Sequence, residues 1–479
     1  MIHILSVLLL LFAAHFTRAQ TWSEPSVIWA KPFNLTYPDF VFDNNGNIHC
    51  VWSAKLGTNY YRIYYSKSTN DGNTWSLPIN ASMNNSLWMT QPHIVCDSDN
   101  HLHLTYDHNV GSIYNTHIIH RVHTGTNWSE ADTVTKGDNP GATYNRLVID
   151  NNDRLYCFWY KNSSARYRYR DKGSGAWSET IQPHSDSLTV FIQKVVVGDE
   201  NTIHCLSYSN LLGYYAFKQS YFKFSEGIWN PIENVGPLTT GNESDIALDS
   251  QGHPHLVWQH TGLSSPGNDS TMYRFFDGTT WSESEFIVQH GYQMAVCIDH
   301  YNNKHIVVSE KIETGYQLVH YRHLNGSWVG EIMDEDEYPH YRPKLMHRGN
   351  QLYLVHGMAD TMIGPNGHTR IVMRKYDIAT GKQYKEMPAV DGINIFPNPF
   401  RHRTNIHFEI LKKARVNVLV YNIKGVLQTT LISAEKEPGK IELNWDGTDS
   451  NGNKVPKGFY IIRVQSDKGV MSKKLEFIY

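Results

Sequence analysis

The chain has 479 residues, of which 40% are hydrophobic, 13% aromatic and only 19% charged. A chain of this kind can bury large cores, and its aromatic share suits a protein built from packed β-sheets. The formal net charge is −3, from 43 basic and 46 acidic side chains, so the chain lacks the basic excess of a dedicated nucleic-acid-binding protein. We therefore expect no nucleic-acid partner.

Residues 1–19 have the pattern of a secretory signal peptide. An apolar run begins at Ile4 and reaches Ala14, and the small residue Ala19 precedes Gln20. The run is too short to cross a bilayer comfortably. We expect cleavage after Ala19, no transmembrane segment and an extracellular location.

A tryptophan recurs at intervals of 47 to 53 residues along the first three quarters of the chain. The positions are Trp22, Trp75, Trp128, Trp177, Trp229, Trp281 and Trp328. Each interval holds apolar runs separated by turns rich in Asn, Asp and Gly, which supply the positive φ of a hairpin. This pattern predicts one four-stranded meander per interval, and seven meanders closing into an all-β, seven-bladed β-propeller over residues 20–383. The strand at Trp22 is expected to complete the last blade and remove the exposed edges.

The turn from Ser68 to Trp75, Ser-Thr-Asn-Asp-Gly-Asn-Thr-Trp, resembles the Asp-box, or BNR repeat, of sialidase-like propellers, with Asn70 in place of the usual aspartate. In that family the box joins the third and outermost strands, far from the active site. The resemblance therefore implies architecture and not chemistry. The sialidase motif Phe/Tyr-Arg-Ile-Pro has no match, since Tyr341-Arg-Pro lacks the isoleucine.

Two repeated residue types are predicted to be structural. The cysteines fall on first and second strands beside alternating apolar neighbours, which favours buried thiols over disulfides; they are Cys50, Cys96, Cys157, Cys205 and Cys297. One slot of the repeat holds histidines, namely His49, His103, His204, His255 and His305. Side chains spread round a ring cannot converge on one ion, so no metal is expected there, and no cofactor is expected elsewhere.

Residues 384–391 form a predicted linker, after which the repeat stops. Residues 392–479 alternate apolar and polar side chains between Gly and Asn turns, which predicts a small immunoglobulin-like β-sandwich that folds independently. The tail is basic, whereas the rest of the chain is acidic. The Asp449-Ser-Asn-Gly452 stretch hints at calcium, but a hairpin turn explains it better.

Five motifs in this tail resemble, in their order, the type A C-terminal sorting domain of the Bacteroidota type IX secretion system. They are Pro397-Asn-Pro-Phe400, Tyr421-Asn-Ile-Lys-Gly425, Trp445-Asp-Gly447, Gly458-Phe-Tyr460 and Lys473-Lys-Leu475. The resemblance implies that the type IX machinery is a partner, that the tail is usually removed during export, and that the protein is secreted or held at the outer-membrane surface. The alternative is an accessory sandwich with no role in export.

Propellers bind ligands at one mouth of the central channel, where first strands begin and where second strands turn into third strands. Polar residues occupy these positions in nearly every repeat. We select as candidate catalytic residues His93, His108, Tyr144 and Arg146, and as candidate substrate-binding residues Asp39, Lys161, Lys194, Asp245, His260 and Arg342. The alternative for each is a side chain that is merely solvated at the channel end.

The stretch from Pro92 to Asn109, with Thr143-Tyr144 and Phe158-Trp-Tyr160 after it, resembles the second and third blades of a propeller family that includes ulvan lyases. Those enzymes remove the proton α to a uronate carboxylate, with His or Tyr as base and acid and Arg neutralising the carboxylate. Of the positions involved, Tyr144 matches, whereas the family's histidines fall on Met89 and Asn109 and its arginine on Tyr160.

Two functions remain open from the sequence. One is a glycan-active propeller that binds or degrades a polysaccharide or glycoprotein, as a lyase or glycoside hydrolase if it is an enzyme. The other is a non-enzymatic adhesion or interaction scaffold.

Overall fold

The computed structural model describes residues 22–31, 37–55, 61–82, 88–111, 115–184, 189–210, 217–239, 241, 243–261, 269–324, 326–359, 369–378, 390–423, 425–466 and 469–478. The predicted signal peptide and residues 384–389 of the predicted linker lie outside the described residues. Described secondary structure is β-strand, apart from a 3-10 turn at Asp199–Asn201. Within these ranges, no helix has the length and apolar character to cross a membrane.

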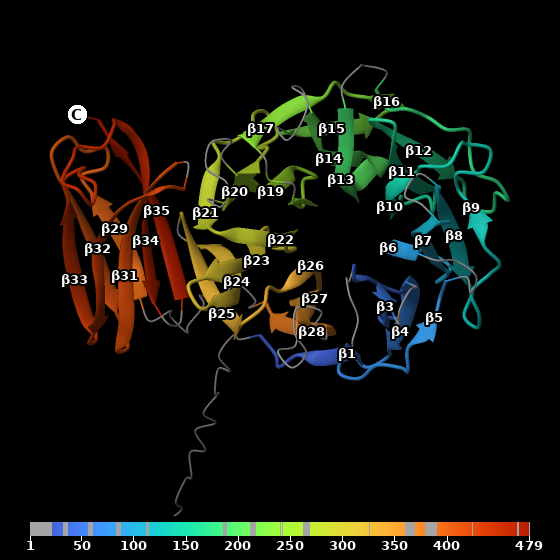
Figure 1. Cartoon of the computed structure of the whole chain (residues 1–479), viewed down its shortest axis with the longest axis horizontal. Helices are drawn as coiled ribbons and strands as arrows, with labels where there is room; N and C mark the ends of the chain where they lie inside the picture. The colour runs from blue at the N-terminus through green and yellow to red at the C-terminus, as the bar shows by residue number, and fades with distance from the viewer. Residues whose placement is uncertain are drawn as a thin grey trace, which may run out of the picture.

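Strands β1 to β28 form antiparallel sheets around a central opening (Figure 1), and this part of the molecule is called the ring below. In chain order its sheets are β2 (Asp39–Phe42), β3 (Ile48–Lys55), β4 (Tyr61–Ser68) and β5 (Ile79–Asn80); β6 (Trp88–Cys96), β7 (Leu102–Asn109), β8 (Thr116–His123) and β9 (Asp132–Thr133); β10 (Thr143–Ile149), β11 (Leu155–Lys161) and β12 (Ser164–Arg170); β13 (Thr189–Val197), β14 (Ile203–Asn210), β15 (Phe217–Ser225), β16 (Ile228–Trp229) and β17 (Glu233–Thr239); β18 (Ser244–Leu248), β19 (Pro254–Thr261), β20 (Asp269–Phe275) and β21 (Glu285–Gln289); β22 (Gly291–Ile298), β23 (Lys304–Ile312), β24 (Gly315–Leu324) and β25 (Ser327–Asp336); and β26 (Tyr341–Arg348), β27 (Gln351–Ala359) and β28 (Thr369–Asp377) with β1 (Ser26–Lys31).

The ring is closed by its own N-terminal strand, as expected, although that strand spans Ser26–Lys31 and begins after Trp22. β1 pairs antiparallel with β28, with Ala30 opposite Arg370. The indole of Trp22 donates a hydrogen bond to Nδ1 of His320 at 3.1 Å and packs against Tyr376 at a ring distance of 5.4 Å. The two ends of the ring therefore share one sheet, which removes an exposed edge.

The hairpin turns between first and second strands are held by aspartates. Asp43 accepts the backbone N–H of Asn47 at 2.7 Å and contacts Nε2 of His49 at 3.2 Å, while Nδ1 of His49 lies 2.8 Å from the Tyr65 hydroxyl. The same aspartate-to-histidine contact recurs at Asp97 and His103, at Asp249 and His255, and at Asp299 and His305. In these four sheets the repeated histidines thus brace the first hairpin from within, which is the structural role expected for them.

These turns also join neighbouring sheets to one another. The backbone N–H of Asn44 donates to the side chain of Asn100 at 2.8 Å, and Ser98 donates in the same way to Asp153 at 2.9 Å. Asn and Asp are therefore needed at these turns as acceptors for a backbone N–H of the preceding sheet as well as for positive φ. The cysteines are free thiols, and all but Cys96 are fully enclosed in the sheets.

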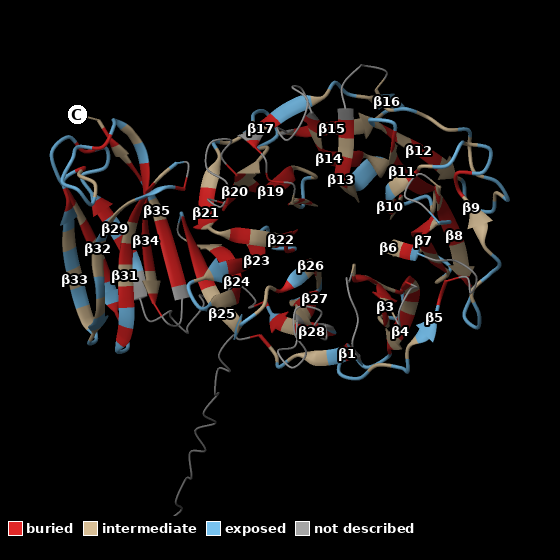
Figure 2. Ribbon diagram, viewed as in Figure 1, coloured by how far each residue is buried: buried red, intermediate tan, exposed pale blue. Residues whose placement is uncertain are grey.

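The C-terminal residues form a β-sandwich, called the sandwich below. One sheet contains β29 (Val390–Phe396), β30 (Thr404–Ile410) and β33 (Gly439–Trp445), and the other β31 (Ala414–Asn422), β32 (Leu427–Lys436), β34 (Gly458–Ser466) and β35 (Gly469–Phe477). Its core includes Phe400, Trp445 and Phe477. Figure 2 shows buried residues on the ring strands and on β34 and β35 of the sandwich, whereas β33 is largely exposed. The first strand starts at Val390, two residues before the expected boundary.

The sandwich is not tethered to the ring by a linker alone. β35 pairs antiparallel with β25, with Trp328 opposite Ser472 and Gly330 opposite Val470. One continuous sheet therefore runs from β22 through β25 and β35 to β32 (Figure 1). The expected arrangement of two separate units differs from this because β25 offers a free edge that β35 fills.

Candidate functional site

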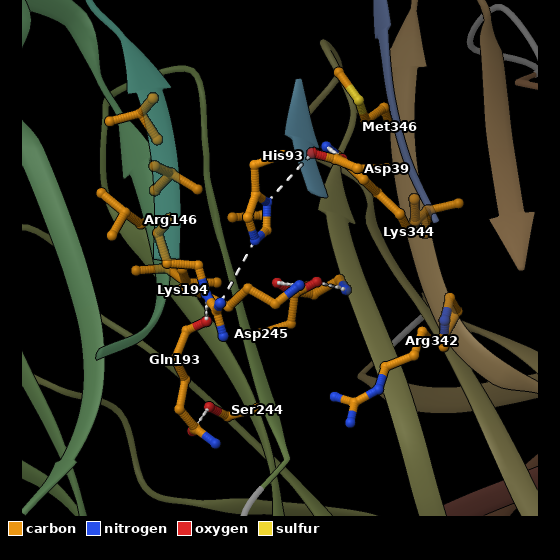
Figure 3. A pocket seen from close by; sticks show the side chains of 18 of the residues that line it. Asp39, His93, Arg146, Gln193, Lys194, Ser244, Asp245, Arg342, Lys344 and Met346 are labelled. Carbon is orange, nitrogen blue, oxygen red and sulfur yellow. Dashed lines mark hydrogen bonds and ion pairs between the residues drawn. The ribbon is translucent and has the colours of Figure 1, made fainter. Parts of the chain in front are cut away.

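The ring encloses a channel of about 750 Å³, which is lined by the first strand of every ring sheet. Its wall carries four cationic side chains, Arg146, Lys194, Arg342 and Lys344, and three carboxylates, Asp39, Glu243 and Asp245. Figure 3 shows the labelled members of this set, all but Glu243, around the channel.

Several of the lining strands carry a bulge at the same end, next to the charged residues. The register shifts in β6, β10, β13, β22 and β26, between Thr90 and His93, Thr143 and Arg146, Ile192 and Lys194, Gly291 and Gln293, and Tyr341 and Lys344. At three bulges a non-glycine residue has left-handed backbone, namely Gln91 at φ 53°, Tyr144 at φ 57° and Arg342 at φ 49°. Such residues cost about 1–3 kcal/mol each, and bulges re-aim side chains beside functional sites.

A buried carboxylate on β7, the second strand of the preceding ring sheet, supports the bulge in β10. Asp107 accepts the backbone N–H groups of Tyr144 at 2.8 Å and Asn145 at 3.2 Å, and the side-chain amide of Asn145 at 2.7 Å. Burial raises the pKa of Asp107 to about 6, although these hydrogen bonds and Arg146 oppose the rise. Asp107 does not line the channel. It therefore supports the backbone of Tyr144 and Asn145 at the bulge, just before Arg146.

Four side chains of the channel wall contact one another in a row: Lys344, Asp39, His93 and Arg146. Asp39 is ion-paired with Lys344 and accepts the backbone N–H groups of Phe40 at 2.9 Å and Ile94 at 3.0 Å. Its carboxylate lies 3.3 Å from Nδ1 of His93. Burial alone would raise the pKa of Asp39, but Lys344 and His93 outweigh it and hold the pKa well below its usual range. Asp39 is therefore ionised and fixes the orientation of the His93 ring.

His93 is a neutral imidazole in this arrangement. Burial lowers its pKa to about 4, against the raising effect of Asp39. Because a carboxylate can only accept, Nδ1 carries the ring proton and Nε2 is an acceptor. Nε2 lies 3.5 Å from Nη1 of Arg146 (Figure 3). The ring thus presents its lone pair next to a guanidinium.

Arg146 is held by carbonyl and amide oxygens. Its Nε donates to the backbone oxygen of Gln193 at 2.5 Å, and its Nη1 to that of Asn145 at 2.7 Å and to the side chain of Gln91 at 3.4 Å. Among the described residues, no carboxylate lies within ion-pair distance of Arg146, whereas Lys194 and Arg342 are paired with Asp245 and Glu243 at 3.4 and 3.1 Å. Burial lowers the pKa of Arg146 from its usual value, with Asp107 opposing. A partly buried guanidinium of this kind is suited to bind an anion.

An aromatic wall stands beside Arg146. The ring of Phe191 lies 4.8 Å from that of Tyr144 and 4.7 Å from that of Tyr208, and Tyr160 closes the cluster at 5.3 Å from Phe191. Tyr144 is 43% exposed. Burial, with help from Tyr37 and Asp107, raises the pKa of Tyr144, so the side chain is a phenol and not a phenolate. Flat apolar faces with polar tips are well suited to sugar rings.

Seven of the ten residues selected from the sequence line the channel, and they all come from first strands: Asp39, His93, Tyr144, Arg146, Lys194, Asp245 and Arg342. The other three, from ends of second strands, do not line it. His108 lies opposite Met89 and His117, Lys161 donates to the backbone oxygen of Asn139, and His260 lies opposite Ser270. A second strand runs about 4.8 Å further from the channel axis. Most of its side chains therefore do not reach the channel, although Tyr208 of β14 does. The expected location of these three at the channel is wrong.

Other channel residues were not selected. Gln91, Phe191, Gln193, Tyr208 and Glu243 line the wall. The bulges bring neighbouring positions of one strand to the same surface, which a strict alternation of sides does not predict. The sequence does contain one signal for them: a polar residue stands directly beside a residue chosen as a candidate, as Gln193 does beside Lys194.

One group outside the channel has the composition of a metal site. Ligand atoms of Asp97, Asp99 and His101 lie within 4.8 Å of one another. Asp97 already accepts the backbone N–H groups of Asp99 and His101 at 3.0 and 2.7 Å, and Asp99 is paired with Lys172 at 2.9 Å. These contacts describe a hairpin turn of the repeated kind, and we assign no metal to it.

The family model of the FlgD Ig-like domain matches residues 401–469, within the sandwich. A search of curated proteins finds no match to the chain. Among solved structures, an ulvan lyase of polysaccharide lyase family PL25, bound to -[GlcA(1-4)Rha3S]-, is similar with a TM-score of 0.50 at 10% identity, over 73% of this chain and 95% of that chain.

Two further structures are similar at lower scores. An α-L-arabinanase of Penicillium chrysogenum complexed with arabinobiose has a TM-score of 0.43 at 14% identity, over 74% of this chain and 98% of that chain. The K499G mutant of NanB sialidase from Streptococcus pneumoniae has a TM-score of 0.43 at 14% identity, over 74% of this chain and 70% of that chain. The described strands make the chain all-β, its body is similar in fold to the ulvan lyase structure, and its C-terminal domain matches an immunoglobulin-like family model.

Proposed function

We propose that the ring is a seven-bladed β-propeller whose channel binds an anionic carbohydrate at Arg146. Each ring sheet is one blade in this proposal, and residues 20–383 form the propeller. The observation that carries the binding proposal is the guanidinium of Arg146, which has oxygen acceptors but no carboxylate partner among the described residues. The solved structure most similar in fold, by TM-score among those named above, is an enzyme bound to a uronate-containing polysaccharide.

The channel wall supplies what such a ligand needs. A carboxylate or sulfate of the ligand can pair with Arg146, and a sugar ring can stack on Tyr144 beside it. Its volume of about 750 Å³ lies within the usual range of small-molecule sites, about 300–1,000 Å³. Lys194 and Arg342 extend the cationic wall, although each is partly neutralised by its carboxylate partner.

A second candidate function, lyase activity, is favoured by the position of His93. Its neutral Nε2 stands beside the guanidinium that would neutralise a uronate carboxylate, and Asp39 fixes its tautomer. A base so placed could take the proton α to the carboxylate, with the phenol of Tyr144 available to protonate the leaving oxygen. Glycoside hydrolysis fits less well, because each of the three channel carboxylates is ion-paired with Lys or Arg.

The binding proposal is tested by calorimetric titration of the full chain with oligosaccharides of a uronate polymer. Arg146→Gln should weaken binding about tenfold to a hundredfold, since a hydrogen bond to a charged group contributes about 1.5–3 kcal/mol. Arg154→Gln is the matched control, because Arg154 lies outside the channel lining and pairs with Asp171 on the surface. Equal affinity for a carboxyl-reduced, neutral oligosaccharide would contradict the proposal. Ultraviolet absorbance of an unsaturated uronate product distinguishes a lyase from a binding protein or adhesion scaffold.

We also propose that the chain is exported through the type IX secretion system and acts outside the cell. The support is the signal-peptide pattern of residues 1–19 and the order of sorting-domain motifs in residues 392–479. The test is expression of the full chain in a Bacteroidota host with and without a working type IX translocon. Export to the medium or cell surface should require the translocon, and equal export without it would contradict the proposal.

A further inference from the structure

The ring and the sandwich each contribute buried residues to the hydrophobic core of the other. Val470 of β35 is fully buried in a cluster with Trp328 and Val319 of the ring, while Val329 of β25 is buried in the core of the sandwich. Ile461 of β34 is buried in another ring cluster. Because the same apolar clusters contain residues of both parts, separation would expose apolar surface on each.

A second contact reaches the neighbouring sheet of the ring. The ring of Tyr421, at the end of β31, stacks on that of Phe286 in β21 at 5.8 Å. Gly425, in the turn after β31, has a φ of +76°, and a Cβ there would lie 2.1 Å from Oγ of Ser270 in β20. The turn thus sits against the sheet of β18 to β21, while β35 extends the sheet of β22 to β25. Contact with two sheets fixes the orientation of the sandwich.

A buried ion pair crosses the same boundary. Nη2 of Arg463 in β34 lies 3.4 Å from the carboxylate of Glu310 in β23, and the two side chains are 5% and 2% exposed. Gln317 donates to the same carboxylate at 2.8 Å, and the hydroxyl of Tyr321 donates to its other oxygen. Burial raises the pKa of Glu310, with Arg463 opposing. Without the sandwich, Glu310 would lose its only cationic partner among the described residues, and the edge of β25 would be open.

From these contacts we infer that the sandwich is a permanent, non-covalently held part of the ring, fixed by the β25–β35 pairing and the Glu310–Arg463 pair. Cutting the chain between Ile378 and Val390 therefore leaves the sandwich in place. The docking surface on β25, β23 and the neighbouring β20 and β21 has this chain's own sandwich as its partner. The functional molecule is then a complex of both parts, whichever ligand the channel binds.

The test uses the full chain with a specific protease site inserted between residues 378 and 390. After complete cleavage, size-exclusion chromatography with mass detection should show both fragments in one peak at micromolar concentration. Separate peaks under native conditions would overturn the inference.

A variant isolates the buried pair. Arg463→Met leaves Glu310 without its cation and should make the cleaved fragments dissociate at least tenfold faster. Arg415→Met, at an exposed position of β31, is the matched control and should behave like the parent. If both variants dissociate at the parental rate, the assignment of the pair is overturned.

Hydrogen exchange on the uncut parent chain tests the pairing without any variant. Backbone amides in Ser327–Gly330 and Gly469–Ser472 should exchange as slowly as those inside the β23–β24 pair. Exchange as fast as that of an exposed edge strand would overturn the inference independently of the fragment experiment.

Discussion

Acidification from pH 7 to pH 5 should destabilise the chain through its buried histidines. Burial lowers the pKa of His93, His204, His255 and His340 from 6.5 to about 4. The unfolded chain binds protons at these residues below about pH 6.5, whereas the folded chain does not until about pH 4. Stability is therefore lost as the pH falls through this window, because the unfolded state takes up more protons.

The size of the effect follows from the two pKa values. At pH 5 each of these histidines lowers the free energy of unfolding by on the order of 2 kcal/mol relative to pH 7. Asp107 acts in the opposite direction, because its pKa is raised from 3.8 to about 6 and the folded state binds a proton there in the same pH window. This raises the free energy of unfolding at pH 5 by on the order of 1 kcal/mol relative to pH 7. Glu310, whose pKa is also raised, adds to that offset. The expected net loss is several kcal/mol.

Urea unfolding followed by tryptophan fluorescence, at half-unit steps from pH 7 to pH 5, measures this loss. His204→Gln should reduce the pH dependence by roughly a quarter of the total for the four histidines, because it removes one of them. A free energy of unfolding that stays constant across this range in the parent chain would refute the reasoning.

Three further predictions concern single side chains. Lys344→Met removes a cation that repels protonated His93, so nuclear magnetic resonance titration should show the pKa of His93 raised. An unchanged pKa would contradict the electrostatic coupling of Lys344 to His93. Gly241→Ala places a Cβ 2.4 Å from a backbone oxygen and should lower the free energy of unfolding by about 1–3 kcal/mol, whereas Gly175→Ala, with open space around it, should lower it much less. Trp22→Ala removes a buried indole that packs on His320 and Tyr376 next to the closing strand, and it should lower the free energy of unfolding by about 3–5 kcal/mol. A loss below about 1 kcal/mol would show that ring closure does not depend on it.

The sequence predicts the ring strongly because its signals repeat. One interval of tryptophan, turn and apolar run can be ambiguous, but the same order recurring from Trp22 to Trp328 allows few folds. The first-strand residues, such as Asp39 and Arg146, were placed at the channel for the same reason. The first strand of every ring sheet lies next to the channel axis, so the same position in each repeat of the sequence is expected to face the channel.

The remaining features depend on contacts between residues far apart in the chain. His108 and Lys161 were misplaced because a turn beside a channel strand still lies one strand away from the axis. The β25–β35 pairing joins residues more than 130 positions apart, and no local pattern specifies it. A signal did exist in β34, where the consecutive residues Tyr460-Ile-Ile place apolar side chains on both faces of the strand. Such a run is typical of a strand covered on each side, and residues 460–464 are indeed buried.

The most direct test of the central claim is a crystal structure of the full chain with a uronate oligosaccharide bound. We expect a ligand carboxylate about 3 Å from the guanidinium of Arg146, with its sugar ring against Tyr144 and within reach of Nε2 of His93. A ligand bound outside the channel, or in the channel with its carboxylate away from Arg146, would contradict the account.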